Sequence, residues 1–314
     1  MLAYILRRSL FLLPLLLVGS MLVFLLLRVA PGDPAAIVLG PEASPQEIET
    51  LRQHLGLNDP LPIQYLTWLR NVVTGNLGNS IISNQPIGPQ IIARLPVTLE
   101  IWFLTLVFGT VFGVSGGILS AVFRDSFVDY AVRLFTVVTL SVPAFFALTL
   151  LIVLPSLWWN YVPPLQYASP FEDPGTNARL FLPPILLLAL EGSAALMRFT
   201  RSACIDVLHQ DYIRTARSKG LAEIMVVSRH MFKNAVIPIV TIVGARLGAI
   251  VSGSVILEQV MSVNGLGQYI YQAILSKDYP VVQVMSLYIG TAIIISHLLV
   301  DVSYAYFDPR IRYQ

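Results

Sequence analysis

Long uninterrupted blocks of apolar residues constrain this chain more than any other feature of its sequence. Six such blocks follow one another along the 314 residues, each near the length of a helix that crosses a bilayer. They cover approximately residues 10–27, 99–123, 130–154, 181–197, 236–257 and 281–304. Within lipid, backbone N–H and C=O groups need partners in their own segment, and the blocks lack the alternation of barrel strands. The sequence therefore predicts an all-α polytopic membrane protein with six transmembrane helices.

Composition excludes a soluble fold and limits the chemistry. Only 12% of the residues are charged, about half the share found in a soluble domain, so they could not cover a water-facing surface. The formal net charge of +2 gives no indication of nucleic acid binding. The single cysteine, Cys204, excludes an internal disulfide and a cysteine-only metal site.

The first apolar block follows Arg7 and Arg8, so a cleaved signal peptide is the alternative to a membrane span. Its apolar core of about 18 residues is longer than that of most signal peptides, and no small-residue cleavage site follows at 28–30. We therefore predict that this block is an uncleaved transmembrane helix.

The distribution of Lys and Arg predicts the orientation in the membrane. Six spans place both termini on one side, and the side richer in Lys and Arg faces the cytoplasm. The side of the termini holds Arg7, Arg8, Arg124, Arg133, Arg198, Arg201, Arg214, Arg217, Lys219, Arg229, Lys233, Arg310 and Arg312. The other side holds Arg28, Arg52, Arg70, Arg94, Arg179 and Lys277 over more residues. Both termini are therefore predicted to be cytoplasmic.

The external segment after the first block, residues 31–97, is predicted to fold into a small unit. Ser44 and Glu47 have the spacing of a helix capping box, and Gly56 can end that helix. A second helix is predicted over 63–73, followed by a tight turn in the sequence GNLGNS at 75–80. The alternative is that the segment only covers the outer ends of the spans.

The internal segment at 198–235 is rich in Lys and Arg. An anionic inner leaflet is enough to explain this charge, but it does not explain the helical pattern. A short polar helix is predicted over 211–219, stopped by Gly220, and a second over about 223–232 leads into the next span. Two short helices on the cytoplasmic side suggest a docking surface.

Within this internal segment, DYIRTARSKGL at 211–221 resembles the cytoplasmic EAA-type loop of ABC transporter permease subunits. Other stretches resemble the dipeptide and oligopeptide branch of that family. They are RVAPGDP at 28–34, GNLGNS, LPVTLE at 95–100, NGLGQYIYQAILSKDYPVVQ at 264–283 and DPRIR at 308–312. The likeness covers nearly the whole chain in order, and it is weak only in the fourth span and at 155–179. The predicted parts are a first segment with one span (1–30), the external loop (31–97) and a permease core of five spans (98–314).

The resemblance implies a permease of the type I ABC importer fold in the plasma membrane of a bacterium or archaeon. A second homologous permease, two cytoplasmic ATPase subunits that bind ATP and Mg, and an external substrate-binding protein would complete the importer. This chain would then be no enzyme and would hold no cofactor of its own. Members of the branch carry dipeptides, oligopeptides, nickel chelates, glutathione or some sugars, and the sequence leaves that choice open.

The resemblance also implies a set of ATPase-coupling residues. Thr215, Ala216 and Arg217 stand where the general motif has Glu, Ala and Ala, and Gly220 is its glycine. A short helix with small Ala216 inward and charges around it can enter a cleft without burying an unpaired charge. The coupling set is Asp211, Arg214, Thr215, Ala216, Arg217, Lys219, Gly220 and Leu221.

Two ionisable residues lie deep in the predicted spans, Glu191 in the fourth and Arg246 in the fifth. Charges at that depth are costly and normally face the interior of a bundle. We therefore treat both as candidate residues of the translocation pathway. Contact with a charged substrate group, pairing with each other, and exposure to a water-filled vestibule are the alternatives.

Small residues recur every four positions in two spans, and this spacing lets helices approach closely. Gly109, Gly113 and Gly117 form one stripe, and Gly244, Gly248 and Ser252 form the other. Helix packing is the favoured interpretation, and a moving pathway wall is the alternative. Pro143 is predicted to kink the third span, because it removes a backbone hydrogen bond.

The sequence carries no motif for catalysis or for a metal site. It has no GxxxxGK[ST] P-loop and no HExxH, and its four histidines lack metal-ligand spacing. A secondary transporter is the alternative function, but it would need internal repeats and a coupling-ion site. No convincing repeat relates the two halves. A membrane-embedded enzyme would need convergent polar residues, and the spans offer only scattered ones.

Overall fold

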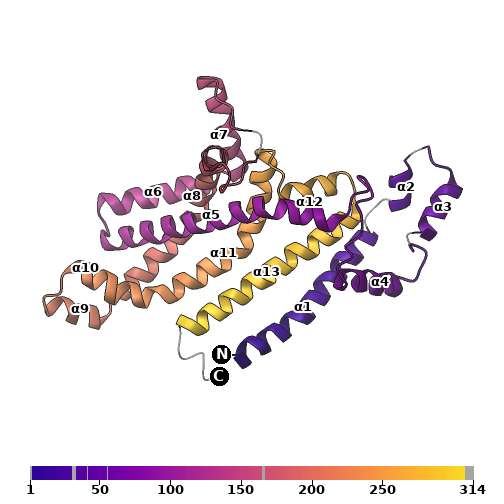
Figure 1. Ribbon diagram of the computed structural model, residues 1–314. Helices are drawn as coiled ribbons and strands as arrows, with labels where there is room; N and C mark the ends of the chain where they lie inside the picture. The colour runs from indigo at the N-terminus through magenta and orange to yellow at the C-terminus, as the bar shows by residue number, and fades with distance from the viewer. Residues whose placement is uncertain (1, 30–32, 41, 55, 165–166, 308–314) are drawn as a thin grey trace. The chain divides into compact units, whose positions relative to one another are not determined.

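The computed structural model describes residues 2–29, 33–40, 42–54, 56–164 and 167–307, and within them it is helical apart from turns and one isolated bridge, between Asn79 and Pro86 (Figure 1). The chain divides into two compact units. The first unit is built mainly from Leu99–Val263, and the second from Leu6–Thr98 with Asn264–Ile294. The long helices α5 (Ile87–Val122) and α13 (Tyr279–Phe307) each contribute to both units.

Among the described residues, four helices are long and apolar enough to cross a membrane. They are α1 (Leu2–Val29), α5, α8 (Pro174–Leu208) and α13. The number rises to six if each of two bent pairs of helical segments is one span. These pairs are Phe127–Ser141 with Ala144–Trp159 and Glu223–Val236 with Pro238–Gly244. These helices correspond in order to the six predicted blocks.

The third predicted block, 130–154, is not one continuous helix. It is divided between α6 (Phe127–Ser141) and α7 (Ala144–Trp159), whose axes differ by 92°. Val142 adopts an extended conformation, and Pro143 precedes the first turn of α7. The predicted effect of Pro143 is therefore confirmed in place, but it is a break instead of a kink. A proline disfavours helical geometry in the residue before it, which explains why α6 ends there.

Helix α8 lies at the centre of the first unit, where α6, α7 and α11 (Phe232–Val260) pack against it (Figure 1). It begins at Pro174, and the side chain of Asp173 accepts a hydrogen bond from Thr176 N at 3.0 Å. An acceptor before the first turn and a proline at its first position are both favourable at a helix start. Because α8 continues to Leu208, the first third of the predicted internal segment is an extension of the fourth span.

The first glycine stripe is a packing surface between α5 and α8. A Cβ atom on Gly113 or Gly117 would lie 2.6 Å from Leu196 Cδ2 or 2.5 Å from Thr200 Cβ. Gly109 faces the backbone of Ala189 in the same way. The prediction of close helix packing is confirmed for this stripe. Gly248 and Ser252 of the second stripe lie outside the side chains that the structure describes.

The second unit contains α2 (Pro34–Leu39), α3 (Pro45–His54), α4 (Leu61–Val73) and α12 (Leu266–Leu275). The capping box is present: Ser44 N donates to Glu47 at 2.8 Å, and Glu47 N donates to Ser44 Oγ at 3.3 Å. Gly56 has the positive φ of a residue that follows a helix end. The last residues of the predicted loop already belong to α5, which begins at Ile87.

The core of the second unit joins the start of α5 to α12 and to the first turns of α13. Its buried residues are Ile87, Ile91, Leu266, Ile270, Ala273, Val281, Val284 and Met285. Buried Asp278 fixes the loop that precedes α5. Its carboxylate accepts hydrogen bonds from Ser80 Oγ at 2.5 Å and from Ile81 N at 3.3 Å. The predicted folded unit at 31–97 is thus completed by residues near the other end of the chain.

Candidate functional site

The predicted short polar helix of the internal segment is α9 (Asp211–Ser218). Its first turn carries Asp211 and its last turn Arg217, so both charges complement the helix dipole. After the helix, Gly220 has a φ of 76°, and Gly220 N donates to Arg217 O at 2.9 Å while Leu221 N donates to Ala216 O at 3.4 Å. This pattern ends a helix and requires a residue that tolerates positive φ. The predicted stop at Gly220 is confirmed.

One face of α9 is fixed to the protein by a small apolar cluster. Ile213 and Ala216 are buried and pack with Val226, and Val207 and Leu208 at the end of α8 cover the same cluster. The inward position expected for Ala216 is therefore correct. Because α9 packs directly on the end of α8, the two helices form one continuous structure around the corner at residues 209–210.

The opposite face of α9 is exposed and charged. Asp211, Arg214, Thr215 and Arg217 of α9 are exposed, as are Lys219 and Gly220, which follow the helix. Arg217 makes a two-pronged contact with Glu223, at 3.1 Å from Nε and 2.6 Å from Nη2. This contact lowers the pKa of the Glu223 carboxyl and raises that of the Arg217 guanidinium. Three exposed apolar side chains, Tyr212, Ile224 and Met225, border the charged face, and the sequence analysis did not include them.

The second predicted helix of this segment is composite. A single turn, α10 (Glu223–Met225), leads into a π-helix, η1 (Val226–Met231), which continues directly into α11. Buried Val226 and Met231 belong to the two apolar clusters on either side of η1. The wider turn was not predictable from apolar spacing, which cannot separate an α-helix from one π turn.

The structure brings the two deep ionisable residues into the same region. Glu191 lies on α8 and Arg246 on α11, which pack together, and both side chains are half-buried. The Arg246 guanidinium occupies the space where Gly192 would carry a side chain. Among the described residues, no hydrogen bond or ion pair within 4 Å joins the Glu191 and Arg246 side chains.

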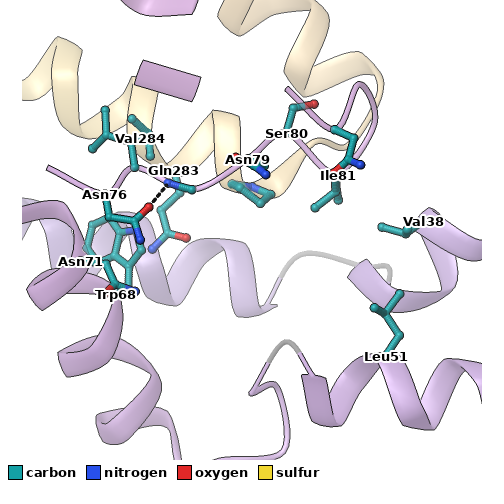
Figure 2. A pocket seen from close by; sticks show the side chains of 14 residues that line it. Val38, Leu51, Trp68, Asn71, Asn76, Asn79, Ser80, Ile81, Gln283 and Val284 are labelled. Carbon is teal, nitrogen blue, oxygen red and sulfur yellow. Dashed lines mark hydrogen bonds between the residues drawn. The ribbon is translucent and has the colours of Figure 1, made fainter. Parts of the chain in front are cut away.

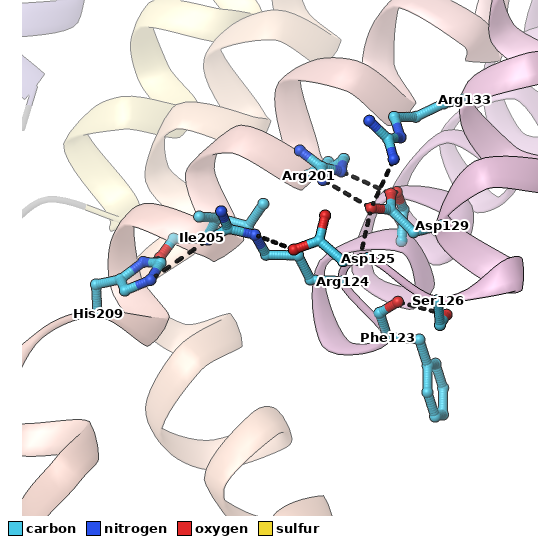
Figure 3. Close-up of polar contacts among 10 residues, drawn as sticks. Phe123, Arg124, Asp125, Ser126, Asp129, Arg133, Arg201, Ile205 and His209 are labelled. Atoms are coloured by element: carbon cyan, nitrogen blue, oxygen red, sulfur yellow. Dashed lines mark hydrogen bonds and ion pairs between the residues drawn. The ribbon is translucent and has the colours of Figure 1, made fainter.

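A polar cluster around Asp129, near the start of α6, was missed by the sequence analysis (Figure 3). The Asp129 side chain is fully buried and receives two hydrogen bonds from Arg201 of α8, at 2.9 Å from Nε and 2.8 Å from Nη2. It also accepts from Ser120 Oγ of α5 at 2.5 Å and from Asp125 N at 3.0 Å. Arg133 Nη2 lies 3.5 Å away on the next turn of α6. No sequence motif marks this cluster, because its members come from three separate helices.

A cleft of about 640 Å³ lies in the second unit, between the loop at 76–84 and the first turns of α13 (Figure 2). Its polar lining consists mainly of carboxamides, from Asn71, Asn76, Asn79, Asn84 and Gln283, beside the indole of Trp68. None of its lining residues is charged. In the described part of the chain, no group of three or more His, Cys, Asp or Glu residues could hold a metal ion.

Comparison with known proteins places this chain in a family. Residues 113–313 match the family described as the binding-protein-dependent transport system inner membrane component, and residues 1–102 match the N-terminal part of such membrane components. The chain belongs to this family. It is therefore a multi-pass permease component of the inner membrane, and this favours an importer over the secondary transporter and the membrane-embedded enzyme.

Two relatives match the chain from end to end. A protein of Brucella abortus (strain 2308), provisionally named as the permease of a peptide transport system, is 38% identical over 313 residues, covering 100% of both chains. The glutathione transport system permease protein GsiC of Escherichia coli (strain K12) is 38% identical over 314 residues, also covering 100% of both chains. These likenesses confirm the resemblance to peptide-type ABC permeases.

A solved structure supports the fold. The crystal structure of an amino acid ABC transporter with histidines aligns with a TM-score of 0.51, covering 71% of this chain and 94% of that one. The sequences are 17% identical, so the likeness concerns the fold alone. It agrees with the predicted helical bundle of a type I importer permease.

Proposed function

We propose that this permease forms the translocation pathway of an ATP-driven importer together with a second homologous permease. Two cytoplasmic ATPase subunits would bind and hydrolyse ATP, and an external protein would deliver the substrate to the second unit. Both termini would lie in the cytoplasm, as the distribution of Lys and Arg suggests. Peptides or a small peptide-like solute such as glutathione are the proposed substrates, which the names of both relatives support.

The observation that carries this proposal is the construction of α9. A short helix is held by Ile213 and Ala216 on one side and exposes a charged face on the other. Such a helix can seat in a groove of an ATPase subunit while its charges keep partners or water. Nucleotide-dependent closure of the ATPases would then displace α9 and, through it, the end of α8. The proposed coupling residues are Asp211, Arg214, Thr215, Ala216, Arg217, Lys219, Gly220 and Leu221. Of these, buried Ala216 and half-buried Leu221 hold the helix, and the exposed residues would contact the ATPase.

Replacing Gly220 tests this role. Valine at a φ of 76° is strained, by about 1–3 kcal/mol, although the space around the residue is open. We expect Gly220→Val to lower import and substrate-stimulated ATP hydrolysis by about tenfold, and to leave the affinity for the binding protein unchanged. Transport and ATPase activity would be measured on the complex that co-purifies with the tagged chain.

A matched control is Gly75→Val. Gly75 follows the end of α4 with a φ of 82° and equally open surroundings, but it belongs to the second unit, whereas α9 belongs to the first. Its replacement carries the same backbone strain and should leave ATP hydrolysis coupled to transport. Unaltered transport in Gly220→Val, or the same loss in both variants, would remove the coupling role from α9.

We also propose that Glu191 and Arg246 pair within the membrane instead of contacting substrate. The position of the Arg246 guanidinium against Gly192, the residue next to Glu191, supports this arrangement. Removing one partner would leave a charge without compensation in a costly place. We therefore expect each single alanine variant to lose most transport, and the exchange Glu191→Arg with Arg246→Glu to recover part of it. An exchange that recovers nothing while the complex stays assembled would favour substrate contact.

A further inference from the structure

The buried carboxylate of Asp129 joins two parts of the first unit that are distant in sequence. Its donors come from the end of α5, from the turn between α5 and α6, and from Arg201 on α8. A buried ion pair of this kind contributes little net stability compared with apolar packing, because both charges lose their hydration. What it does provide is one fixed geometry: a two-pronged Arg–carboxylate contact constrains both distance and orientation.

A second contact joins the same two parts closer to α9. Arg124, in the turn between α5 and α6, places Nη1 3.5 Å from Nε2 of His209. His209 terminates α8, and its Nδ1 lies 2.8 Å from Ile205 O. Only Gln210 then separates His209 from the first residue of α9. The turn between α5 and α6 therefore contacts the corner that leads into α9 through Arg124, while Asp129, at the start of α6, contacts α8 at Arg201 (Figure 3).

The apolar packing around these contacts continues the connection. Ala121 at the end of α5 shares a buried cluster with Leu196 and Cys204 of α8, and with Met231 at the end of η1. The segments before and after α9 are thus both packed against the structure that Asp129 fixes. A displacement of α9 cannot be absorbed at the corner unless these contacts break.

We infer that Asp129 is a positioning residue for energy coupling, which makes the α5–α6 turn move together with the α8–α9 corner as one rigid body. This inference rests on the proposed coupling role of α9. The inference adds a second route for the movement of α9. A displacement of α9 moves α8 directly, and through the contacts of Asp129 it also moves α5 and α6. The residue touches neither nucleotide nor substrate and acts through Arg201.

The test is a distance measurement in the intact complex. Spin labels would be placed at Phe127→Cys and Gln210→Cys, two exposed positions on the joined parts, in a Cys204→Ala background. Distances are recorded by pulsed electron resonance without nucleotide and after trapping with ATP and vanadate. With Asp129 present, we expect one narrow distribution that is the same in both states. Asp129→Asn should broaden it or make it depend on nucleotide, and it should lower the ratio of binding-protein-stimulated to basal ATP hydrolysis.

Matched variants keep the result interpretable. Asp125→Asn removes an exposed carboxylate four residues away that pairs with Arg124 and makes no hydrogen bond to Arg201, and it should behave like the unaltered chain. If Asp129→Asn fails to assemble, Arg201→Lys keeps the charge and loses the two-pronged contact. A distance that changes with nucleotide in the unaltered chain overturns the inference, as does a variant that keeps the narrow, constant distribution. Cross-linking of Lys219→Cys to a co-purified ATPase reports separately on the proposed role of α9.

Discussion

Two ion pairs near the corner between α8 and α9 have the same chemistry and opposite surroundings. In each, an arginine contacts a carboxylate through Nε and Nη2: Arg201 with Asp129, and Arg217 with Glu223. The Asp129 side chain is fully buried, whereas the Glu223 side chain is 51% exposed. The first pair joins two helices and the second joins α9 to the start of the next short helix. Burial, and not the type of contact, therefore separates a pair that fixes structure from one that can exchange partners.

The two pairs also differ in the structure that surrounds them. The buried pair lies next to the close approach of α5 to α8 at the glycine stripe, and Ser120 at the end of α5 donates a hydrogen bond to Asp129. The exposed pair needs no such approach, since both its members lie within one short segment. An exposed pair keeps most of its hydration and is screened by salt. It is therefore suited to a surface that meets a partner.

The largest effect is expected when the buried pair is broken. Arg201→Ala leaves the Asp129 carboxylate buried without its main partner, which costs about 3–5 kcal/mol. The corresponding change in the exposed pair, Arg217→Ala, should cost about 1 kcal/mol or less. Thermal unfolding of the detergent-solubilised complex measures both. Equal losses in the two variants would show that burial does not distinguish the pairs.

A smaller effect is expected when the approach of α5 to α8 is blocked. In Gly117→Val, the new side chain would meet Thr200 and the backbone oxygen of Met197, whose separations from a Cβ are only 2.5 and 2.7 Å. Overpacking of this kind costs about 1–3 kcal/mol. Gly290→Val is the control, because no atom lies within 4 Å of its Cβ position. A melting temperature lowered equally by both changes would contradict a specific role for the stripe.

The smallest effect concerns pH and the exposed pair. Because Arg217 lowers the pKa of Glu223, the stabilisation is fully present above the unfolded pKa of Glu and is lost as pH falls through the lowered folded value. The difference in melting temperature between the unaltered chain and Arg217→Ala should therefore be present at neutral pH and disappear in acid. If the difference in melting temperature instead grows as pH falls, Arg217 does not stabilise the protein through its ion pair with Glu223.

Features that depend on neighbours in sequence were predictable, and those that depend on distant partners were not. The capping box at Ser44, the stop at Gly220 and the apolar blocks each follow from short spacings. The glycine stripe on α5 predicted a close contact with another helix, but it did not predict that this helix would be α8. Asp129 sits at the start of an ordinary apolar helix, and only the fold reveals that Ser120 and Arg201 surround it. The bend at Pro143 was predictable in place, but its size depends on how α6 and α7 pack on α8.

The break between α6 and α7 has a consequence for the solvent around it. With 15 and 16 residues, the two helices measure about 22 and 24 Å, so neither alone crosses a hydrocarbon core of about 30 Å. At the break, Val142 is extended and Pro143 lacks an N–H, so the last carbonyls of α6 have no helical donors ahead of them. Hydrocarbon cannot supply donors. If α6 and α7 together form one span, residues 141–143 must therefore face protein or water within the membrane, and not lipid.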